Sequence, residues 1–198
     1  MSQPYIERSF EPVLKKAASE FPAVVLTGPR QSGKTTLFQH LFGKSYQYVS
    51  LEPPDVRASA IEDPRSFLEL YPSPVIFDEV QYAPDLLPYI KEKIDAERDK
   101  SGQYLLTGPQ NLVPMERVTE SLAGRTAILR LLPLSKREAE GKPKASLPWE
   151  SKQSSFKASK LSFSELWKGF IKGSYPELKA YPRRDVHLWH ASYIQTYL

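Results

Sequence analysis

The stretch Gly28-Pro29-Arg30-Gln31-Ser32-Gly33-Lys34-Thr35 fits a pattern in which two glycines, separated by four residues, are followed by Lys and Thr. Glycine lets the backbone turn tightly, so that successive N–H groups can approach phosphate oxygens. A lysine at this position places a cation near the β and γ phosphates, and the threonine hydroxyl can ligate Mg²⁺. The pattern therefore predicts a loop that cradles a nucleotide triphosphate. The predicted nucleotide-binding residues are Gly28, Pro29, Arg30, Gln31, Ser32, Gly33, Lys34, Thr35 and Thr36.

The residues around this loop have the patterns that the motif requires. Residues 23–26 are a short apolar run rich in valine, which is typical of a buried strand, and residues 35–42 carry apolar side chains at helical spacing. A helix that begins at the loop adds the attraction of its N-terminal dipole for an anion. Strand, glycine loop and helix are therefore expected in this order.

A second motif lies at residues 74–79, where an apolar run ends in Asp78 and Glu79. In open parallel sheets, ligands bind outside the carboxyl ends of the strands, so an acid pair at such an end is well placed for chemistry. We expect Asp78 to hold Mg²⁺, directly or through water, and Glu79 to orient or deprotonate an attacking water. Thr35 and Asp78 are the predicted metal ligands, and Glu79 and Lys34 are predicted catalytic residues.

The remaining patterns predict strands that alternate with helices. Strands are expected at residues 46–51, 103–107 and 126–132, and helices at 5–21, 56–61, 64–70, 84–100 and 115–123. This alternation predicts a three-layer α/β sandwich with a parallel sheet. Thr107, Gln110 and Asn111 follow one of these strands and are candidate sensors of the γ phosphate, although turn formation explains Gly-Pro-Gln-Asn equally well.

Composition limits the domain organisation and the partners. The chain has 198 residues, no cysteine and a formal charge of +4, which allows one domain with an appendage and permits, without requiring, a nucleic-acid partner. Residues 142–160 are rich in lysine, serine and proline. We therefore predict an ATPase core at 1–140, a linker or insertion at 141–161 and a helical segment at 162–198. No run approaches the length of a membrane span, and we expect a cytoplasmic protein without a membrane partner.

The chain resembles a prokaryotic family of AAA-like ATPases, in which an ATPase core precedes a C-terminal domain of unknown function. The most specific match is the string Val75-Ile-Phe-Asp-Glu-Val-Gln-Tyr-Ala-Pro84, and further matches include Leu26–Thr36, Tyr48–Glu52, Leu105–Gly108 and Ser121–Arg125. Similarity continues into Gly173–Glu177 and Tyr193–Leu198, so it covers most of the chain.

The resemblance implies a P-loop fold with strand order 5-1-4-3-2 and with ATP and Mg²⁺ as ligands. It also implies that Arg125 is an arginine finger or a phosphate contact, although Arg125 could instead pair with an acid near the fifth strand. The sensor region reads Thr-Gly-Pro-Gln where the family more usually has Thr-Gly-Ser. Because the chain stops where the family's C-terminal domain would begin, we expect a truncated protein, with an aromatic C-terminal helix as a surface for a homo-oligomer or a protein partner.

Three functions follow from these features. The first is an ATPase whose cycle drives or switches an attached C-terminal module. The second is a nucleotide-gated binding module that hydrolyses little ATP. The third is a P-loop kinase for a small molecule, which would require an arginine-rich lid that does not stand out in the sequence.

Overall fold

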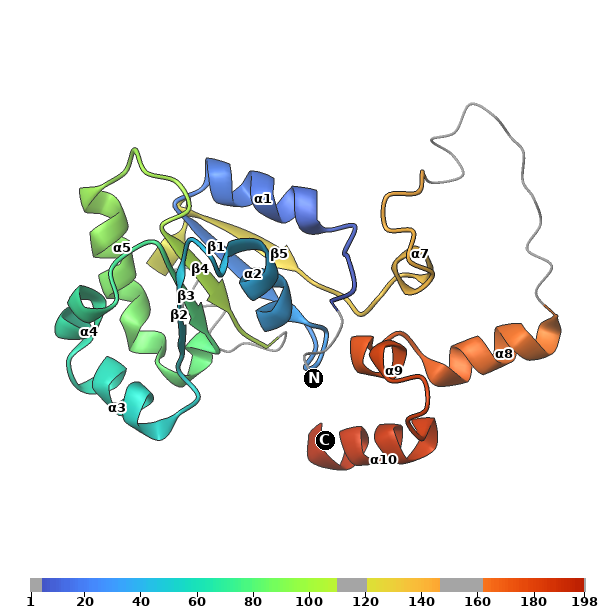
Figure 1. The fold of residues 1–198 in the computed structure, drawn as a ribbon. Coiled ribbons are helices and arrows are strands. Elements are labelled where there is room, and N and C mark those ends of the chain that lie inside the picture. The colour runs from blue at the N-terminus through green and yellow to red at the C-terminus, as the bar shows by residue number, and fades with distance from the viewer. Residues whose placement is uncertain (1–4, 110–120, 147–161, 198) are drawn as a thin grey trace. The chain divides into compact units, whose positions relative to one another are not determined.

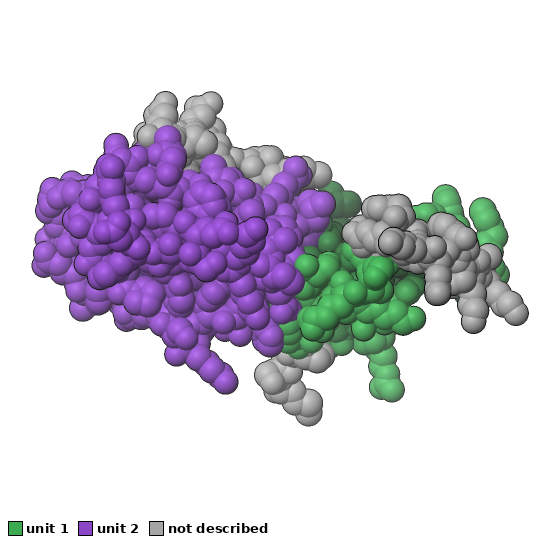
Figure 2. Space-filling model, turned by 90° about the horizontal axis from the view of Figure 1, so that it is seen from above, with its two compact units in different colours: residues 1–9, 133–198 green, residues 10–132 purple. Residues whose placement is uncertain are grey.

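A computed structural model describes residues 5–109, 121–146 and 162–197. The chain divides into two compact units (Figure 2). Residues 10–132 form the first, here called the sheet unit, and residues 1–9 together with 133–198 form the second, here called the helical unit. The domain boundaries predicted at residues 140 and 161 stay a prediction.

A five-stranded sheet forms the centre of the sheet unit (Figure 1). All four neighbouring pairs are parallel, and the strand order is β2-β3-β4-β1-β5. This order confirms the predicted order 5-1-4-3-2 and the predicted fold class. The strands are β1 (Ala23–Thr27), β2 (Gln47–Ser50), β3 (Val75–Asp78), β4 (Tyr104–Thr107) and β5 (Thr126–Arg130).

Helices cover both faces of this sheet (Figure 1). On one face lie α1 (Glu11–Glu20) and α2 (Lys34–Phe42), and on the other lie α3 (Pro54–Glu62), α4 (Pro64–Leu70) and α5 (Leu87–Ala96). Two short 3₁₀ helices, η1 (Val80–Tyr82) and η2 (Pro84–Leu86), connect β3 to α5. The sheet unit is therefore a three-layer α/β sandwich, as its sequence predicts.

Proline determines where two helices begin. The helix predicted at 5–21 begins only at Glu11, and the helix predicted at 84–100 is regular only from Leu87 to Ala96. Both helices have a proline in their first turn, Pro12 and Pro88, where its missing N–H leaves no hydrogen bond unmade. The predicted cap Asp63 is confirmed, because its side chain accepts a hydrogen bond from the Ser66 N–H at 3.1 Å. Most of the helix predicted at 115–123 lies outside the described residues.

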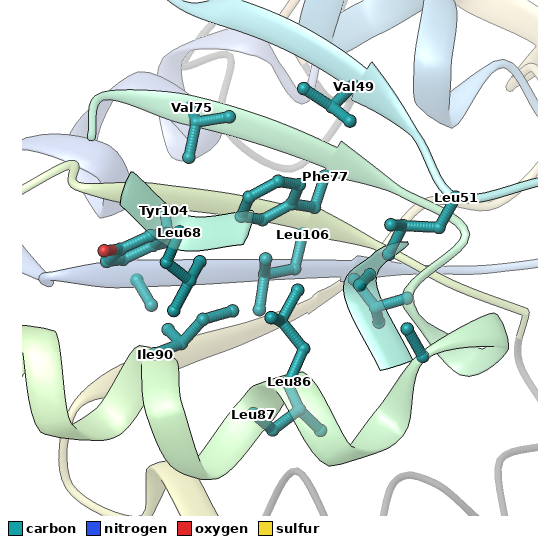
Figure 3. Close-up of a cluster of buried hydrophobic side chains, with 14 of the residues drawn as sticks. Val49, Leu51, Leu68, Val75, Phe77, Leu86, Leu87, Ile90, Tyr104 and Leu106 are labelled. Carbon is teal, nitrogen blue, oxygen red and sulfur yellow. The ribbon is translucent and has the colours of Figure 1, made fainter. Parts of the chain in front are cut away.

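Side chains from the sheet and from α3, α4 and α5 meet in one apolar cluster on the face that α5 covers (Figure 3). Phe77 and Leu106 project from β3 and β4 toward Leu86, Leu87 and Ile90, and all of these side chains are at most 1% exposed. Burial of a side chain of this size stabilises the fold by about 1.5–3 kcal/mol. The cluster fixes β3 and β4 side by side, and the polar side chains that end these strands are therefore neighbours.

The helical unit contains α7 (Lys136–Ala139), α8 (Phe163–Lys172), α9 (Pro176–Ala180) and α10 (Val186–Tyr197). Tyr175, Trp189 and Tyr193 pack with ring centroids about 5 Å apart, a separation typical of stabilising aromatic pairs. In contrast, Phe163 and Phe170 of α8 are 80% and 67% exposed. Within the described ranges, no helix is long and apolar enough to cross a membrane.

Glu138 joins the two segments of the helical unit. Its side chain is 4% exposed, and it accepts hydrogen bonds from the backbone N–H groups of Ser135 (2.7 Å) and Ser9 (2.8 Å), from the Ser9 hydroxyl (2.8 Å) and from Arg8 (3.2 Å). Burial alone would raise the pKa of Glu138, but the hydrogen bonds and the Arg8 charge outweigh it and lower the pKa to about 2. The ionised carboxylate is therefore a structural element of this unit.

The depressed pKa predicts a loss of stability in acid. Because the folded-state pKa lies below the unfolded value, Glu138 contributes its stability above about pH 4.5 and loses it as the pH falls toward about 2. We expect a contribution of about 2 to 3 kcal/mol to the free energy of unfolding at pH 7. Urea unfolding of the wild-type chain and of Glu138→Gln at pH 7 and pH 3 measures this contribution. Glu140→Gln is the control, because Glu140 is exposed. Equal losses of stability at both pH values would contradict the prediction.

Candidate nucleotide site

The glycine loop joins the end of β1 to the start of α2, as the motif requires. Gly28 has a φ of 147°, and Gly33, the residue before α2, has a φ of 92° and is left-handed. A Cβ at Gly28 would lie 2.2 Å from the Leu131 carbonyl oxygen, so no side chain fits there. The backbone conformation therefore requires glycine at both positions, 28 and 33. Gln31 also has a positive φ, 59°, which is uncommon for a residue with a side chain.

Lys34 is folded back onto the loop that precedes it. Its ammonium donates to the carbonyl oxygens of Gly28 (3.0 Å) and Pro29 (3.1 Å), and the residue is only 6% exposed. Burial lowers the pKa of Lys34, while the charges of Glu79 and Asp78 act in the opposite direction. The lysine is thereby held at the mouth of the loop, close to both carboxylates of the second motif.

The carboxylate of Asp78 accepts hydrogen bonds from hydroxyl groups of three other elements. Thr35 Oγ1, at the start of α2, lies 3.0 Å from both Asp78 oxygens, and Tyr48 Oη, on β2, donates to Oδ2 at 2.8 Å. The Thr107 hydroxyl, at the end of β4, donates to Oδ1. Burial and the bond to Asp78 both raise the pKa of Tyr48, which keeps its hydroxyl a donor. The two sequence motifs therefore meet around one carboxylate.

Glu79 follows directly and has an unusual backbone. Its φ of 60° and ψ of 52° are left-handed, a conformation that is uncommon for a residue with a side chain and is associated with functional sites. The Glu79 N–H donates to Thr107 Oγ1 at 3.0 Å, and the Glu79 carboxylate accepts from Gln81 Nε2 at 2.6 Å. The Thr107 hydroxyl thus contacts both residues of the acid pair, through the Asp78 carboxylate and through the Glu79 backbone N–H.

The residues present fit a magnesium ion that is shared with a nucleotide. Mg²⁺ prefers oxygen ligands and keeps several waters, so that the protein commonly supplies one or two groups beside substrate phosphates. The Thr35 hydroxyl and the Asp78 carboxylate are such oxygen donors, already 3.0 Å apart. In the described part of the chain no group of three or more His, Cys, Asp or Glu side chains could hold a metal.

The structure brings together most of the site residues predicted from the sequence. Thr35, Asp78, Glu79 and Thr107 are linked by the hydrogen bonds above, and the charges of Asp78 and Glu79 act on Lys34. Strand β4 lies between β1 and β3, as a sensor role for Thr107 requires. Gln110 and Asn111 lie outside the described residues. Thr36 and Arg30 are exposed beside the loop.

Sequence reasoning gave no role to Tyr48 and Gln81, although both lie within strings that carried the family resemblance. Tyr48 reaches Asp78 from the neighbouring strand, and Gln81 reaches back to Glu79 from η1. The alternation of β2 could have indicated that Tyr48 shares a face with the site. For Gln81 the sequence offers no physical signal, because a short 3₁₀ turn has no periodicity.

Arg125 does not lie at this site, so the proposed finger role is wrong within a single chain. Arg125 directly precedes β5, and its carbonyl accepts a hydrogen bond from the N–H of Ala23, the first residue of β1. The glycine loop begins after Thr27, at the other end of β1, roughly 13 Å away along the strand. The guanidinium instead binds both carboxylate oxygens of Asp95, at 2.7 and 3.0 Å, which is the alternative that the sequence left open.

Because Arg125 pairs with Asp95, we expect Arg125→Ala to lower the melting temperature slightly and to leave ATP hydrolysis per molecule unchanged within about twofold. Thermal unfolding and phosphate release, measured on the same preparation, test this expectation. The matched control is Arg98→Ala, which removes the more exposed arginine beside Asp95. A large loss of hydrolysis at unchanged stability would show instead that Arg125 acts on a neighbouring molecule.

Comparisons with known proteins agree with this fold. A family model described as an AAA domain matches residues 20–140. Among solved structures, the chain is similar to the Walker-type ATPase PABY2304 of Pyrococcus abyssi, with a TM-score of 0.55 and 14% identity over 97% of this chain and 72% of that one. At this identity the likeness concerns the fold alone.

Two curated relatives are longer than this chain. The uncharacterized proteins Rv2008c of Mycobacterium tuberculosis and Mb2031c of Mycobacterium bovis are each 29% identical to it over 187 residues. The match covers 93% of this chain and 37% of each relative. The chain therefore spans little more than a third of the length of these relatives.

Proposed function

Because this chain belongs to the AAA-domain family of P-loop ATPases, we propose that it binds ATP with Mg²⁺ and hydrolyses it to drive or switch an attached C-terminal module. One observation carries the proposal. The hydroxyl of Thr35, from the glycine loop, lies 3.0 Å from the carboxylate of Asp78, from the acidic motif 43 residues later. Two motifs that each predict part of a Mg-ATP site are thus in contact.

Each residue of the site has a role in this proposal. The N–H groups of Gly28 and of residues 30–35, which include the start of α2, bind the phosphates. Lys34 exchanges its bonds to the Gly28 and Pro29 carbonyls for bonds to the β and γ phosphates. Thr35 and Asp78 hold Mg²⁺, which when bound neutralises charge on the phosphate oxygens. Thr107 positions Asp78 and the Glu79 backbone by the bonds described above.

Glu79 acts as the general base. Its carboxylate accepts a proton from a water molecule as that water attacks the γ phosphorus, and the bond from phosphorus to the ADP oxygen breaks. The products are ADP and inorganic phosphate. The acid pair favours water as acceptor over a small metabolite, because a carboxylate beside the metal ligand can take the proton of an attacking water.

We propose that the module corresponds to the further length of the curated relatives, of which this chain matches 37%. We propose that the C-terminal helix α10 forms part of a contact with that module or with a second copy. Leu188 and Ile194 of α10 are 67% and 55% exposed, while Trp189 of the same helix is 8% exposed. One side of α10 is thus packed within the helical unit and another side presents apolar groups. A cytoplasmic location and a nucleic-acid partner stay predictions from the sequence.

The proposal is tested by measuring ATP binding and phosphate release together, with and without Mg²⁺, and with GTP beside ATP. Binding accompanied by Mg²⁺-dependent phosphate release supports an ATPase. Binding without release would favour the nucleotide-gated module, and absence of binding would contradict both functions.

A further inference from the structure

Two hydroxyl groups hold the Asp78 carboxylate from the two strands that flank it. Strand β3 lies between β2 and β4 in the sheet (Figure 1). Tyr48 of β2 donates to Asp78 Oδ2 at 2.8 Å, and Thr107 of β4 donates to Oδ1. Each carboxylate oxygen therefore has a hydroxyl partner of its own, one from each side of β3.

The Thr35 hydroxyl meets the same carboxylate between these two contacts. Its Oγ1 is 3.0 Å from both Asp78 oxygens, so it lies midway between them. A carboxylate accepts hydrogen bonds at about four lone-pair positions, and Tyr48 and Thr107 occupy one position on each oxygen. The positions that remain are available to Thr35 and to a metal ion or its bound water.

The position of Tyr48 on β2 calls for a side chain as long as tyrosine. Ser50 lies directly opposite Asp78, and Tyr48 precedes Ser50 by two residues, on the same face of β2. The spacing of residues and strands in a sheet places the Cα atoms of Tyr48 and Asp78 roughly 8 Å apart. A phenol hydroxyl spans this separation, whereas the hydroxyl of a serine or threonine would not reach Asp78.

We propose that Tyr48 is a positioning residue of the magnesium site, an inference that rests on the proposed binding of ATP with Mg²⁺. The carboxyl group of an aspartate turns easily about its last bond. The hydroxyls of Tyr48 and Thr107 restrict this rotation and hold the Asp78 carboxylate in one orientation before the metal binds. Outer partners of this kind orient metal ligands, and their loss commonly weakens metal binding about 10- to 100-fold.

Tyr48 is the better of the two flanking residues for a test. Thr107 Oγ1 also accepts a hydrogen bond from the Glu79 N–H at 3.0 Å, so a substitution of Thr107 disturbs both acidic residues. Among the hydrogen bonds of the described residues, Tyr48 contacts Asp78 and not Glu79. Its side chain is 37% exposed, so the loss of one hydroxyl should leave the fold stable. A change at Tyr48 therefore isolates the orientation of Asp78.

The test is Tyr48→Phe, which removes the hydroxyl and keeps the ring. Electron paramagnetic resonance measures the binding of Mn²⁺ to the chain with a non-hydrolysable ATP analogue, because Mn²⁺ shares the preference of Mg²⁺ for oxygen ligands. A fluorescent ATP analogue is titrated at several Mg²⁺ concentrations and in EDTA. We expect metal binding to weaken about 10-fold. Nucleotide affinity in EDTA should stay within about twofold of wild type, and high Mg²⁺ should restore the affinity of the variant.

Tyr46→Phe is the matched control. It removes the same hydroxyl from a tyrosine directly before β2, where the Tyr46 ring packs against Phe42 with centroids 5.3 Å apart. We expect metal binding in Tyr46→Phe to equal that of the wild-type chain. The melting temperature of each variant, measured in the same buffer, checks that the fold is intact.

The possible results separate this inference from the proposed function. Metal binding in Tyr48→Phe equal to wild type would overturn the inference alone, and tighter binding would overturn it by showing that Tyr48 competes with the metal. An equal loss of nucleotide affinity with and without metal would assign Tyr48 a structural role only. A wild-type chain that binds no nucleotide, or binds it without any dependence on metal, would contradict the proposed function as well.

Discussion

Glu79→Gln is expected to lower ATP hydrolysis by about 1,000-fold while ATP remains bound. The substitution removes the negative charge and the ability to take a proton but keeps the shape of the side chain, because an amide has nearly the same shape as a carboxylate. Both hydroxyl contacts of Asp78 with Thr35 and Thr107 are independent of the Glu79 side chain. The phosphate and metal sites should therefore stay intact, and the variant should accumulate in its ATP-bound form.

Phosphate release and nucleotide binding, followed in the same samples, measure both parts of this prediction. Glu69→Gln on α4 is a matched control, since Glu69 is exposed and remote from the motifs. Turnover equal to wild type in Glu79→Gln would remove Glu79 from the mechanism. Loss of binding together with turnover would assign it to the nucleotide site instead.

Lys34→Ala should weaken ATP binding by about 100-fold or more, because charge-assisted hydrogen bonds to two phosphate groups are lost in a largely buried site. The change also removes two hydrogen bonds, to the carbonyl oxygens of Gly28 and Pro29. The loop itself is kept in shape by its glycines, so the fold should survive. Titration with a fluorescent ATP analogue measures the affinity, and circular dichroism checks the fold.

Lys44→Ala is the control for this variant, because Lys44 is exposed just beyond the end of α2. Lys44→Ala removes one positive charge, as Lys34→Ala does, but outside the glycine loop. Wild-type affinity in Lys34→Ala would contradict the phosphate-binding role of the loop. An equal loss of affinity in Lys44→Ala would point to a general effect of net charge.

The sequence by itself determined the features that depend on short stretches of chain. The glycines at 28 and 33, the valine-rich run before them and the acid pair at 78–79 each have a local physical meaning, in backbone freedom, in burial and in charge. From these, the P-loop, the alternation of strands and helices and five residues of the site could be predicted. The strand order came from a family resemblance, since no short pattern states which strands are neighbours.

Only the tertiary structure decided which side chains meet. Tyr48 binds Asp78 because β2 and β3 are paired in parallel with Ser50 opposite Asp78, and the register of two strands is set by the whole core. Arg125 lies at the end of β1 remote from the glycine loop because β5 runs parallel to β1, with Thr126 opposite Ala23. Gln81 meets Glu79 because the chain turns back after β3. Contacts between distant segments depend on how the whole core packs, and the packing depends on side chains from many segments at once. No single segment therefore predicts them.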